Sequence, residues 1–517
     1  MNKINTVIYQ TQYKKFLQLG FIMVLAIISR ILWFGKYPQG IHADEAYAAY
    51  EAFCISNYGI DSWGYHNPVY LTTWGSGMST MNTYLMIPFV LIGGLNIYTI
   101  RMPQMILGIL SVFLLYRIFE KIADEKLAFW AGFLMAICPW HIMLSRWGLD
   151  ANLAPAFILF AIYFAVLGFE KEKYLILSFI FFGLSLYCYV LLWLFVPFFL
   201  IFSIYYCNQY NKIKINKYLI TAIFFLIIIA LPLILFVIIN IGLLPEIKTS
   251  WISIPKLISF RSDEFTLKNI IDNIKNLFRI YIKQNDDNIM SVTPFFGLYY
   301  LFSLPFIISG ALIIIKNAVY NLKNKLFGYD LFLLVWILID IIISLLKSMC
   351  IHRANQLNLA VLFLIIIAIN KMYPKIKPFL FFIYLFAFCI FESYYFTKYQ
   401  DIIKEVQLVG SKEALEYAIE LYEEKEINTI RISNQIRHPQ VLFYTKYPVD
   451  LYRETVEWKN YPDKWVEAER IGYFVWDTNI LDNSIYVLTK NEIEKFKEAG
   501  YNIKQFETCY TAYLNEQ

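Results

Sequence analysis

Charged residues are scarce in this chain of 517 residues. Asp, Glu, Lys and Arg together make up 16% of it and hydrophobic residues 59%, whereas a soluble globular domain has about 25% charged residues. This balance excludes a nucleic-acid-binding protein, a disordered scaffold and an ordinary cytosolic enzyme. Recurrent long apolar stretches instead predict an integral membrane protein with many spans.

Cysteine is also sparse, because seven residues in a chain of this length are too few for a disulfide framework. Several of them fall in or beside apolar runs, where a role in the packed core is the better interpretation. The sequence further lacks a phosphate-binding Walker loop, a dinucleotide-binding glycine pattern and a serine nucleophile elbow. Soluble nucleotide-dependent chemistry is therefore not supported.

The charges that are present divide the chain into two regions. From about residue 397 to the end there are 15 Lys and Arg against 21 Asp and Glu, and the remainder is basic. We therefore expect a membrane domain over 1–396 and a water-soluble domain over 397–517. Periodicity in the second region predicts a small α/β domain, with helices at 411–425 and 491–499 and strands at 428–432, 473–476 and 484–489.

About eleven apolar stretches in 1–396 are long enough to span a bilayer, and the stretch at 80–98 is ambiguous. If 80–98 does not span, all six short basic connectors fall on the cytoplasmic side, as the positive-inside rule requires. We therefore expect an all-α polytopic protein of the plasma membrane. In it 80–98 is an interfacial helix broken near Pro88 and Gly93–Gly94, and the C-terminal domain is extracytoplasmic.

Two adjacent carboxylates, Asp44 and Glu45, follow the first expected span directly. Ionised groups at a membrane boundary are costly unless they are solvated, paired or used in chemistry. A functional interpretation is a general base that accepts a proton from an acceptor hydroxyl. The alternative is the first turn of a helix, where acidic side chains are stabilised by the helix dipole.

The second expected outer loop contains Arg146 and Asp150, four residues apart. Arg146 has a fork of donors that matches phosphate oxygens, and Asp150 is a candidate for a further active-site carboxylate. If the segment is helical, the two side chains have the spacing of a simple ion pair at the membrane boundary. Both interpretations stay open at this point.

The last expected outer connector concentrates positive charge in Lys347, His352 and Arg353. The phosphate of a lipid-linked sugar suits such a cluster, and the alternative is that these side chains reach lipid headgroups. Residues 66–80 mix aromatic and small polar side chains, among them His66, Tyr70 and Trp74. These suit sugar binding, although aromatic residues also anchor any membrane interface.

Histidine is rare, and four of the five residues lie in the expected outer segments, His352 among them. The other three are His42, His66 and His141. Together with Asp44 they offer ligands for a divalent metal, but their spacing resembles no metal-binding pattern. Hydrogen-bonding or solvated histidines are the better interpretation, and His42 and His66 are candidates for substrate binding. Metal dependence is left open.

Several of these elements, in this order, resemble the GT-C superfamily of membrane glycosyltransferases. They are Asp44-Glu45 after the first span, Arg101-Met102-Pro103 at the start of the next, and Pro139-Trp140-His141-Ile142 with Ser145-Arg146, then an acid and Asn152. More narrowly, the set is similar to the family-39 group related to protein O-mannosyltransferases and lipid A aminoarabinose transferases. The resemblance covers roughly 16–197.

The resemblance implies a polyprenyl-phosphate-linked sugar donor, an extracytoplasmic active site and a catalytic role for Asp44, with Glu45 beside it. Asp150 matches the acid of the second loop, Arg146 its Ser-Arg motif, and Arg353 loosely matches a late basic residue that contacts donor phosphate. Relatives carry Lys-Pro-Pro or His-Pro-Pro-Leu where this chain has His66-Asn67-Pro68-Val69. This departure indicates a different acceptor or sugar.

We therefore expect an inverting glycosyltransferase in which the two acids and the distant basic cluster meet at one donor. The acceptor is a protein, a cell-wall polymer or a lipid, and nucleic acid is not a partner. The alternative is a translocase that moves a lipid-linked sugar without transferring it, although such carriers usually show repeats and intramembrane ionisable residues. A third reading is a membrane scaffold that presents the C-terminal domain.

Overall fold

The computed structural model describes residues 2–260, 269–286, 288–425 and 427–514, and most of them are helical. They form two compact units, each assembled from three segments of the chain. The first comprises Met1–Phe34, Gln104–Leu231 and Ser262–Phe396. The second comprises Gly35–Pro103, Pro232–Arg261 and Thr397–Gln517. The C-terminal segment thus belongs to the same compact unit as the loop that follows the first expected span.

The first unit is a bundle of apolar helices. Its elements are α1 (Asn2–Ile31), most of α4 (Ile97–Ile122), α5 (Glu125–Ile137), α6 (Pro139–Leu144), η2 (Asp150–Leu153), α7 (Ala154–Glu170), α8 (Tyr174–Ser185), α9 (Leu192–Gln209), most of α10 (Lys217–Asn240), α11 (Ile270–Tyr281), η5 (Leu301–Ser303), α12 (Leu304–Lys323), α13 (Asp330–Leu346), α14 (Asn355–Lys371) and α15 (Lys377–Tyr395).

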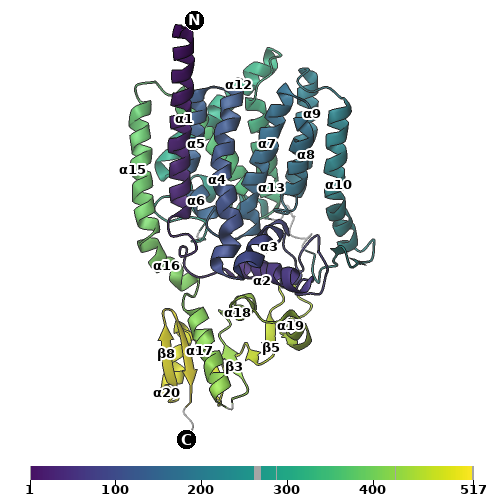
Figure 1. The fold of residues 1–517 in the computed structure, drawn as a ribbon, viewed down its shortest axis with the longest axis vertical. Helices are drawn as coiled ribbons and strands as arrows, with labels where there is room; N and C mark the ends of the chain where they lie inside the picture. The colour runs from purple at the N-terminus through teal and green to yellow at the C-terminus, as the bar shows by residue number, and fades with distance from the viewer. Residues whose placement is uncertain (1, 261–268, 287, 426, 515–517) are drawn as a thin grey trace. The chain divides into compact units, whose positions relative to one another are not determined.

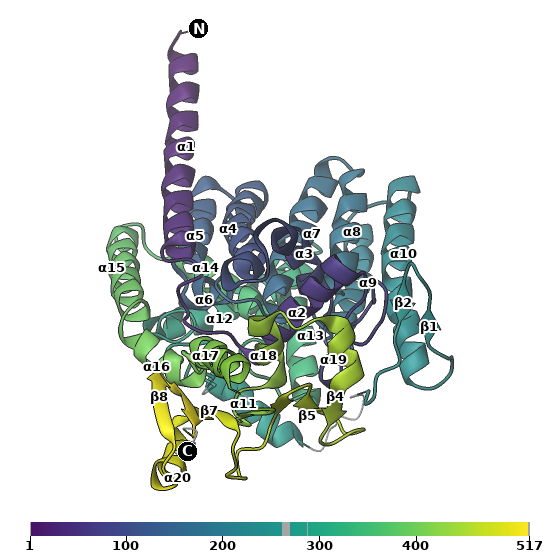
Figure 2. The same cartoon turned by 60° about the horizontal axis from the view of Figure 1, so that its bottom comes forward.

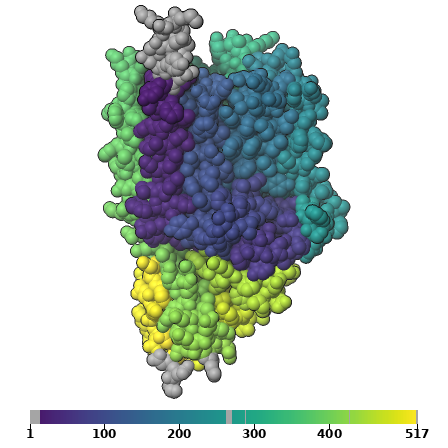
Figure 3. Space-filling model, in the orientation of Figure 1, coloured from purple at the N-terminus to yellow at the C-terminus, as the bar shows by residue number. Residues whose placement is uncertain are grey.

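Helix α14 forms the centre of this bundle. It packs against α5, α7, α12 and α13, and most of its residues are buried. A helix that is apolar on all sides is expected in such a position. By contrast, α15 packs on α5 and exposes Phe379, Phe382 and Phe386 along one stripe. Such a stripe faces lipid, and α1 and α15 both lie at the surface (Figure 3).

Among the described residues, five helices are long and apolar enough to cross a membrane: Asp150–Glu170, Leu192–Gln209, Lys217–Asn240, Leu301–Lys323 and Lys377–Tyr395. The predicted multi-pass membrane protein is confirmed at this level, and the number of eleven spans stays a prediction. The expected interfacial stretch at 80–98 contains the short helix α3 (Met81–Gly93). The predicted break near Gly93–Gly94 is confirmed, because α3 ends at Gly93 and its C-cap Gly94 has a φ of 74°. The predicted break at Pro88 is wrong, because α3 continues through this proline.

The second unit contains a seven-stranded sheet in the order β4-β5-β6-β3-β7-β9-β8. The strand β3 (Ile430–Ile432) runs parallel to β6 (Phe474–Val475) and to β7 (Ile485–Thr489), and these are the three predicted strands. The antiparallel pairs add four strands that the sequence did not predict: β4 (Val456–Trp458), β5 (Ala468–Ile471), β8 (Asn502–Phe506) and β9 (Cys509–Tyr513).

Helices complete this unit, and two of them match the predicted helices at 411–425 and 491–499. The helices of the C-terminal segment are α16 (Lys398–Val406), α17 (Ser411–Glu424), α18 (His438–Thr445), α19 (Val449–Thr455) and α20 (Ile493–Glu498). The first loop supplies α2 (Ala43–Tyr58) and α3, and α2 packs against both α3 and α18 (Figure 1). Figure 2 shows the hairpin of β8 and β9 with α20 beside it.

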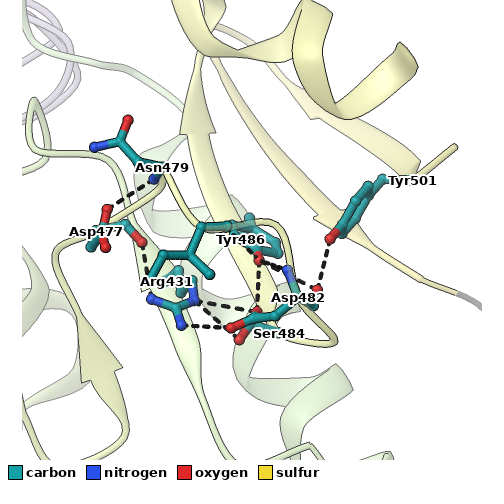
Figure 4. Close-up of polar contacts among 8 residues, drawn as sticks. Arg431, Asp477, Asn479, Asp482, Ser484, Tyr486 and Tyr501 are labelled. Carbon is teal, nitrogen blue, oxygen red and sulfur yellow. Dashed lines mark hydrogen bonds and ion pairs between the residues drawn. The ribbon is translucent and has the colours of Figure 1, made fainter. Parts of the chain in front are cut away.

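A polar network joins the centre of the sheet to the loop that leads into β7 (Figure 4). Arg431 on β3 donates hydrogen bonds to both carboxylate oxygens of Asp482, over 3.3 and 2.6 Å, and to Ser484. The hydroxyl of Tyr486 donates to the same carboxylate over 2.7 Å. Burial opposes ionisation of Asp482, but these donors prevail and lower its pKa to about 2.

Candidate active site

The helix α2 begins at the two carboxylates that the sequence singled out. His42 is the N-cap residue, and its Nδ1 accepts a hydrogen bond of 3.2 Å from the backbone N–H of Asp44. Asp44 and Glu45 therefore lie in the first turn, where the helix dipole stabilises negative charge. The structural interpretation of the pair as a helix start is confirmed, and it leaves a chemical role open.

Glu45 forms a fully buried ion pair with Arg101 on α4. Nε of Arg101 lies 2.7 Å from Oε1 of Glu45, and Nη2 lies 2.8 Å from Oε2. Arg101 also donates to the carbonyls of Pro38 and Gly40. Neither side chain of the pair is exposed. Through Arg101, the Glu45 carboxylate therefore connects the start of α2 with the segment that contains Pro38 and Gly40. Both oxygens of Glu45 are engaged in this ion pair.

Asp44 has different surroundings, although it is the next residue in the chain. The indole Nε1 of Trp74 donates a hydrogen bond of 2.8 Å to Oδ1 of Asp44. The second oxygen, Oδ2, lies 3.7 Å from Nδ1 of His42, and about a third of the Asp44 side chain is exposed. Asp44 is thus a carboxylate held in one orientation and accessible from outside the protein.

Trp74 is held in an unusual backbone conformation. Its φ of 57° and ψ of 7° lie in the left-handed region, which is strained for a bulky residue. The carbonyl of Trp74 accepts a hydrogen bond of 2.9 Å from the N–H of Val466, in the C-terminal segment. Its ring makes edge contacts with Tyr47, His438 and Trp465. The C-terminal segment therefore helps to fix the Trp74 indole, which donates the hydrogen bond to Asp44.

His438, the first residue of α18, lies among these aromatic rings. Burial lowers its pKa to about 3, and the charge of Arg437 acts in the same direction. His438 is therefore neutral at physiological pH. In the part of the chain that the structure describes, its Nε2 has no hydrogen-bond partner. The sequence analysis did not single out His438, because it lies almost 400 residues after Asp44.

A second pair of acids lies close to Asp44 in the chain and was also not predicted. Glu51 is buried on α2 and accepts hydrogen bonds from the N–H and the hydroxyl of Ser62. Asp61 is buried in the next loop and accepts from the N–H groups of Trp63 and Tyr65. Burial raises the pKa of Asp61 to about 7 and raises that of Glu51, next to the Asp61 charge.

The other predicted substrate-binding residues of this unit differ in exposure. His66 is partly exposed, and its Nδ1 lies 2.9 Å from the carbonyl oxygen of Gly59. Tyr70 is buried, and its ring centroid lies 4.6 Å from that of Phe236. The roles of His42, His66, Tyr70 and Trp74 in binding a substrate stay predictions.

In the first unit, Arg146 is fully buried between α6 and η2. Its Nη1 donates to the carbonyl of Ser29 and its Nη2 to that of Leu32, over 2.9 and 2.8 Å. Its guanidinium also lies over the ring of Phe396. Residues 145–149 fall between two helices, so the helical spacing considered for Arg146 and Asp150 does not apply. The proposed phosphate contact of Arg146 stays a prediction.

Asn355 brings the second outer loop and the last connector together. Its Nδ2 donates to the carbonyl of Ala151 and to Oδ1 of Asn152, over 3.0 and 3.1 Å. Its Oδ1 accepts from the indole of Trp140 over 2.9 Å. Asp150 and Arg353 therefore lie on two segments that one buried amide joins. Both segments belong to the first unit.

The last connector, between α13 and α14, forms hydrogen bonds with the loop between α11 and η5. Asp286 accepts a hydrogen bond of 2.6 Å from the N–H of Ile351, and Asn288 Nδ2 lies 3.4 Å from His352 Nδ1. Arg353 donates to the carbonyl of Ser348 over 3.2 Å and is partly exposed, whereas Lys347 is buried. The connector thus holds its basic side chains on an ordered backbone.

Within the described ranges, no group of three or more His, Cys, Asp or Glu side chains is placed to hold a metal ion. His141 lies inside the first unit, with its Nδ1 2.7 Å from Nη2 of Arg30. Of the residues considered as ligands, His42 and Asp44 are the ones that lie together.

The family model for dolichyl-phosphate-mannose-protein mannosyltransferases matches residues 79–236. No curated protein matches the chain in sequence. Among solved structures, the chain is similar to ArnT from Cupriavidus metallidurans in the apo state, with a TM-score of 0.56 and 9% identity over 96% of this chain and 98% of ArnT. The undecaprenyl-phosphate-bound form of ArnT gives a TM-score of 0.55 and 10% identity over 95% and 98% of the two chains.

The chain is also similar to the archaeal oligosaccharyltransferase AglB from Archaeoglobus fulgidus, solved with an inhibitory peptide and a dolichol phosphate. The TM-score is 0.51 and the identity 14%, over 85% of this chain and 64% of AglB. At such low identities the likeness concerns the fold. The expected helical membrane body with a small C-terminal sheet domain is therefore confirmed as an ArnT-like fold.

Proposed function

Because this chain belongs to the GT-C superfamily of membrane glycosyltransferases, related to O-mannosyltransferases and ArnT, we propose that it transfers a sugar from a polyprenyl-phosphate-linked donor. The acceptor is a hydroxyl group on an extracytoplasmic protein, wall polymer or lipid. The observation that carries the proposal is the difference between the two adjacent acids. Glu45 is neutralised by Arg101, whereas Asp44 is oriented by Trp74 and accessible.

Asp44 acts as the general base of the reaction. The acceptor oxygen attacks the anomeric carbon while Asp44 takes the hydroxyl proton, which increases the electron density on that oxygen. The bond between the anomeric carbon and the phosphate oxygen breaks, and the phosphate leaves with the electron pair. A single displacement of this kind inverts the anomeric centre.

Positive charge stabilises the departing phosphate, because negative charge grows on it during the reaction. We assign this role to Arg353, with Lys347 and His352 on the same connector. Asp150 lies on the neighbouring segment that Asn355 fixes, and we assign it to orienting the sugar. Glu45 and Arg146 then act as positioning residues, since their polar atoms are engaged in buried contacts.

The test is the Asp44→Asn variant in proteoliposomes that contain a radiolabelled polyprenyl-phosphate-linked sugar. We expect transfer to fall about 10²- to 10⁴-fold, the usual contribution of a general base. The matched control is Asp450→Asn, an exposed acid of the same unit, which leaves transfer unchanged. Full activity of the Asp44→Asn variant would remove Asp44 from its assigned role. Movement of the donor across the bilayer without sugar release would support a translocase instead.

A further inference from the structure

A cavity of about 390 Å³ lies within the first unit, away from the residues discussed above. Most of its walls come from the C-terminal halves of α4, α7, α9 and α14, from the N-terminal half of α13 and from α8, and α5 and α12 add Leu127 and Asn317. These walls are almost entirely apolar, and they include the buried side chains of Phe182, Leu333 and Trp336. Its volume falls in the usual range for ligand pockets, about 300–1,000 Å³.

The rim of the cavity is polar. Asn370 and Lys371 end α14 there, and Asp330 begins α13. Nδ2 of Asn317 donates a hydrogen bond of 3.0 Å to Oδ1 of Asp330. The side chain of Lys371 is exposed. A ligand that fills this space therefore needs an apolar chain that contacts the walls. Its other end needs a polar group that interacts favourably with the positive charge of Lys371.

The surrounding connectors are basic as well. Five short connectors of the first unit fall at this end of the bundle, each of them contains lysine, and lysines outnumber acids. They follow α4, α7, α9, α12 and α14, and they carry Lys121 and Lys126, Lys171 and Lys173, Lys212, Lys214 and Lys217, Lys323 and Lys325, and Lys371, Lys375 and Lys377. Clusters of this kind attract anionic lipid headgroups.

The cavity is distinct from the donor-phosphate site that we assigned. The connector with Lys347 and Arg353 joins the C-terminal end of α13 to the N-terminal end of α14, whereas the cavity lies at the opposite ends of both helices. The 17 residues of α14 separate the two places by about 25 Å. The far end of a polyprenyl chain carries no polar group, so it does not account for the polar rim.

We propose that this cavity binds an acyl chain of an anionic phospholipid, with the phosphate of the lipid beside Lys371. The acyl chain replaces the empty volume between these helices by apolar contacts, and a ligand that binds the folded state alone stabilises it. The site is independent of sugar transfer, because it lies at the end of the bundle away from the basic connector of the proposed reaction.

The test uses the full chain in vesicles of phosphatidylglycerol and phosphatidylcholine, with a trace of phosphatidylglycerol that carries a diazirine on its acyl chain. After irradiation, mass spectrometry locates the adducts. We expect adducts on peptides with Leu333 and Trp336, whose side chains are 6% and 2% exposed and lie away from lipid at the protein surface. Unlabelled phosphatidylglycerol competes for this labelling better than phosphatidylcholine does.

The variant Ala165→Phe fills the cavity, and we expect labelling of Trp336 to fall about tenfold or more, since each excluded methylene weakens lipid binding. The control Ile220→Phe, on the exposed face of α10, retains labelling. Ser203→Phe is a second filling variant if Ala165→Phe does not fold. Lys371→Gln weakens the preference for phosphatidylglycerol about fivefold without abolishing labelling.

Two results would overturn the proposal. The first is unchanged labelling of Trp336 in folded Ala165→Phe and Ser203→Phe variants. The second is competition by polyprenyl phosphate that equals or exceeds that of phosphatidylglycerol, which would assign the cavity to the donor lipid. A failure of sugar transfer in the Asp44→Asn test leaves both readouts unaffected, so the two proposals are judged separately.

Discussion

The indole nitrogen of Trp74 lies 2.8 Å from Oδ1 of Asp44 and donates a hydrogen bond to it. The other oxygen, Oδ2, lies 3.7 Å from Nδ1 of His42, and about a third of the Asp44 side chain is exposed. The hydrogen bond from Trp74 connects the proposed base to the C-terminal segment, because the carbonyl of Trp74 is held by Val466. Asp44 is thus oriented by a residue that is itself fixed by a part of the chain almost 400 residues away.

We expect the Trp74→Phe variant to lower sugar transfer about tenfold, since a hydrogen bond to a charged group contributes about 1.5–3 kcal/mol. The ring and its packing are largely kept, so the protein remains folded. The measurement is kcat/KM with the labelled donor. The control Trp458→Phe changes another indole of the same cluster that does not contact Asp44, and it retains activity. Equal losses in both variants would indicate a general packing effect.

The pair of Glu45 and Arg101 is expected to act on stability. Replacing one member leaves a buried charge without its partner, which destabilises a protein by about 3–5 kcal/mol. We expect Glu45→Gln and Arg101→Met to lower the thermal unfolding midpoint in detergent, and the double variant to recover part of the loss. If each single variant has the same unfolding midpoint as the parent protein, the pair does not contribute to stability.

The raised pKa of Asp61 predicts a pH dependence of stability. Burial raises this pKa to about 7, whereas an aspartate in an unfolded chain titrates near 3.9. Between these values the folded state binds more protons than the unfolded state, so the free energy of unfolding decreases as the pH rises from about 4 to 7. We expect a higher unfolding midpoint at pH 5 than at pH 8, and a smaller difference in Asp61→Asn.

Membrane orientation can be measured with single cysteines in a background without the partly exposed Cys350 and the exposed Cys389. Lys375→Cys lies on a basic connector and Lys412→Cys on the C-terminal domain, and both positions are exposed. We expect an impermeant thiol reagent to label Lys412→Cys in intact cells and Lys375→Cys only after lysis. The reverse pattern would place the C-terminal domain in the cytoplasm.

Much of the fold follows from local patterns in the sequence. Apolar length predicts the membrane helices, and alternation of apolar residues predicts β3, β6 and β7, because these signals lie within a few residues of each other. The strand β8 was missed because it is polar and largely exposed. The strand β9 was missed because its place depends on pairing with β7 on one side and with β8 on the other. The break at Pro88 was wrong because the surrounding apolar residues favour a helix despite one lost hydrogen bond.

The candidate site was predictable in part. The acids at 44 and 45 were found because charge at a membrane boundary requires a reason, but their different partners depend on tertiary contacts. The pairing of Arg101 with Glu45 could have been predicted from the sequence, since a buried Glu45 needs a cation and Arg101 starts the next apolar stretch. The contacts of His438 and Val466 with Trp74 could not have been predicted, because nothing in a single sequence relates these residues to Trp74.

The membership of the C-terminal segment in the same compact unit as the first loop has a consequence for biosynthesis. The ribosome synthesises α2 early and α18 late. The helix α2 therefore packs against α18 only after the last quarter of the polypeptide has begun to be made. Contacts of such long sequence separation form slowly. A nascent chain that stops after α15 therefore contains α2 without the helix α18 that packs against it.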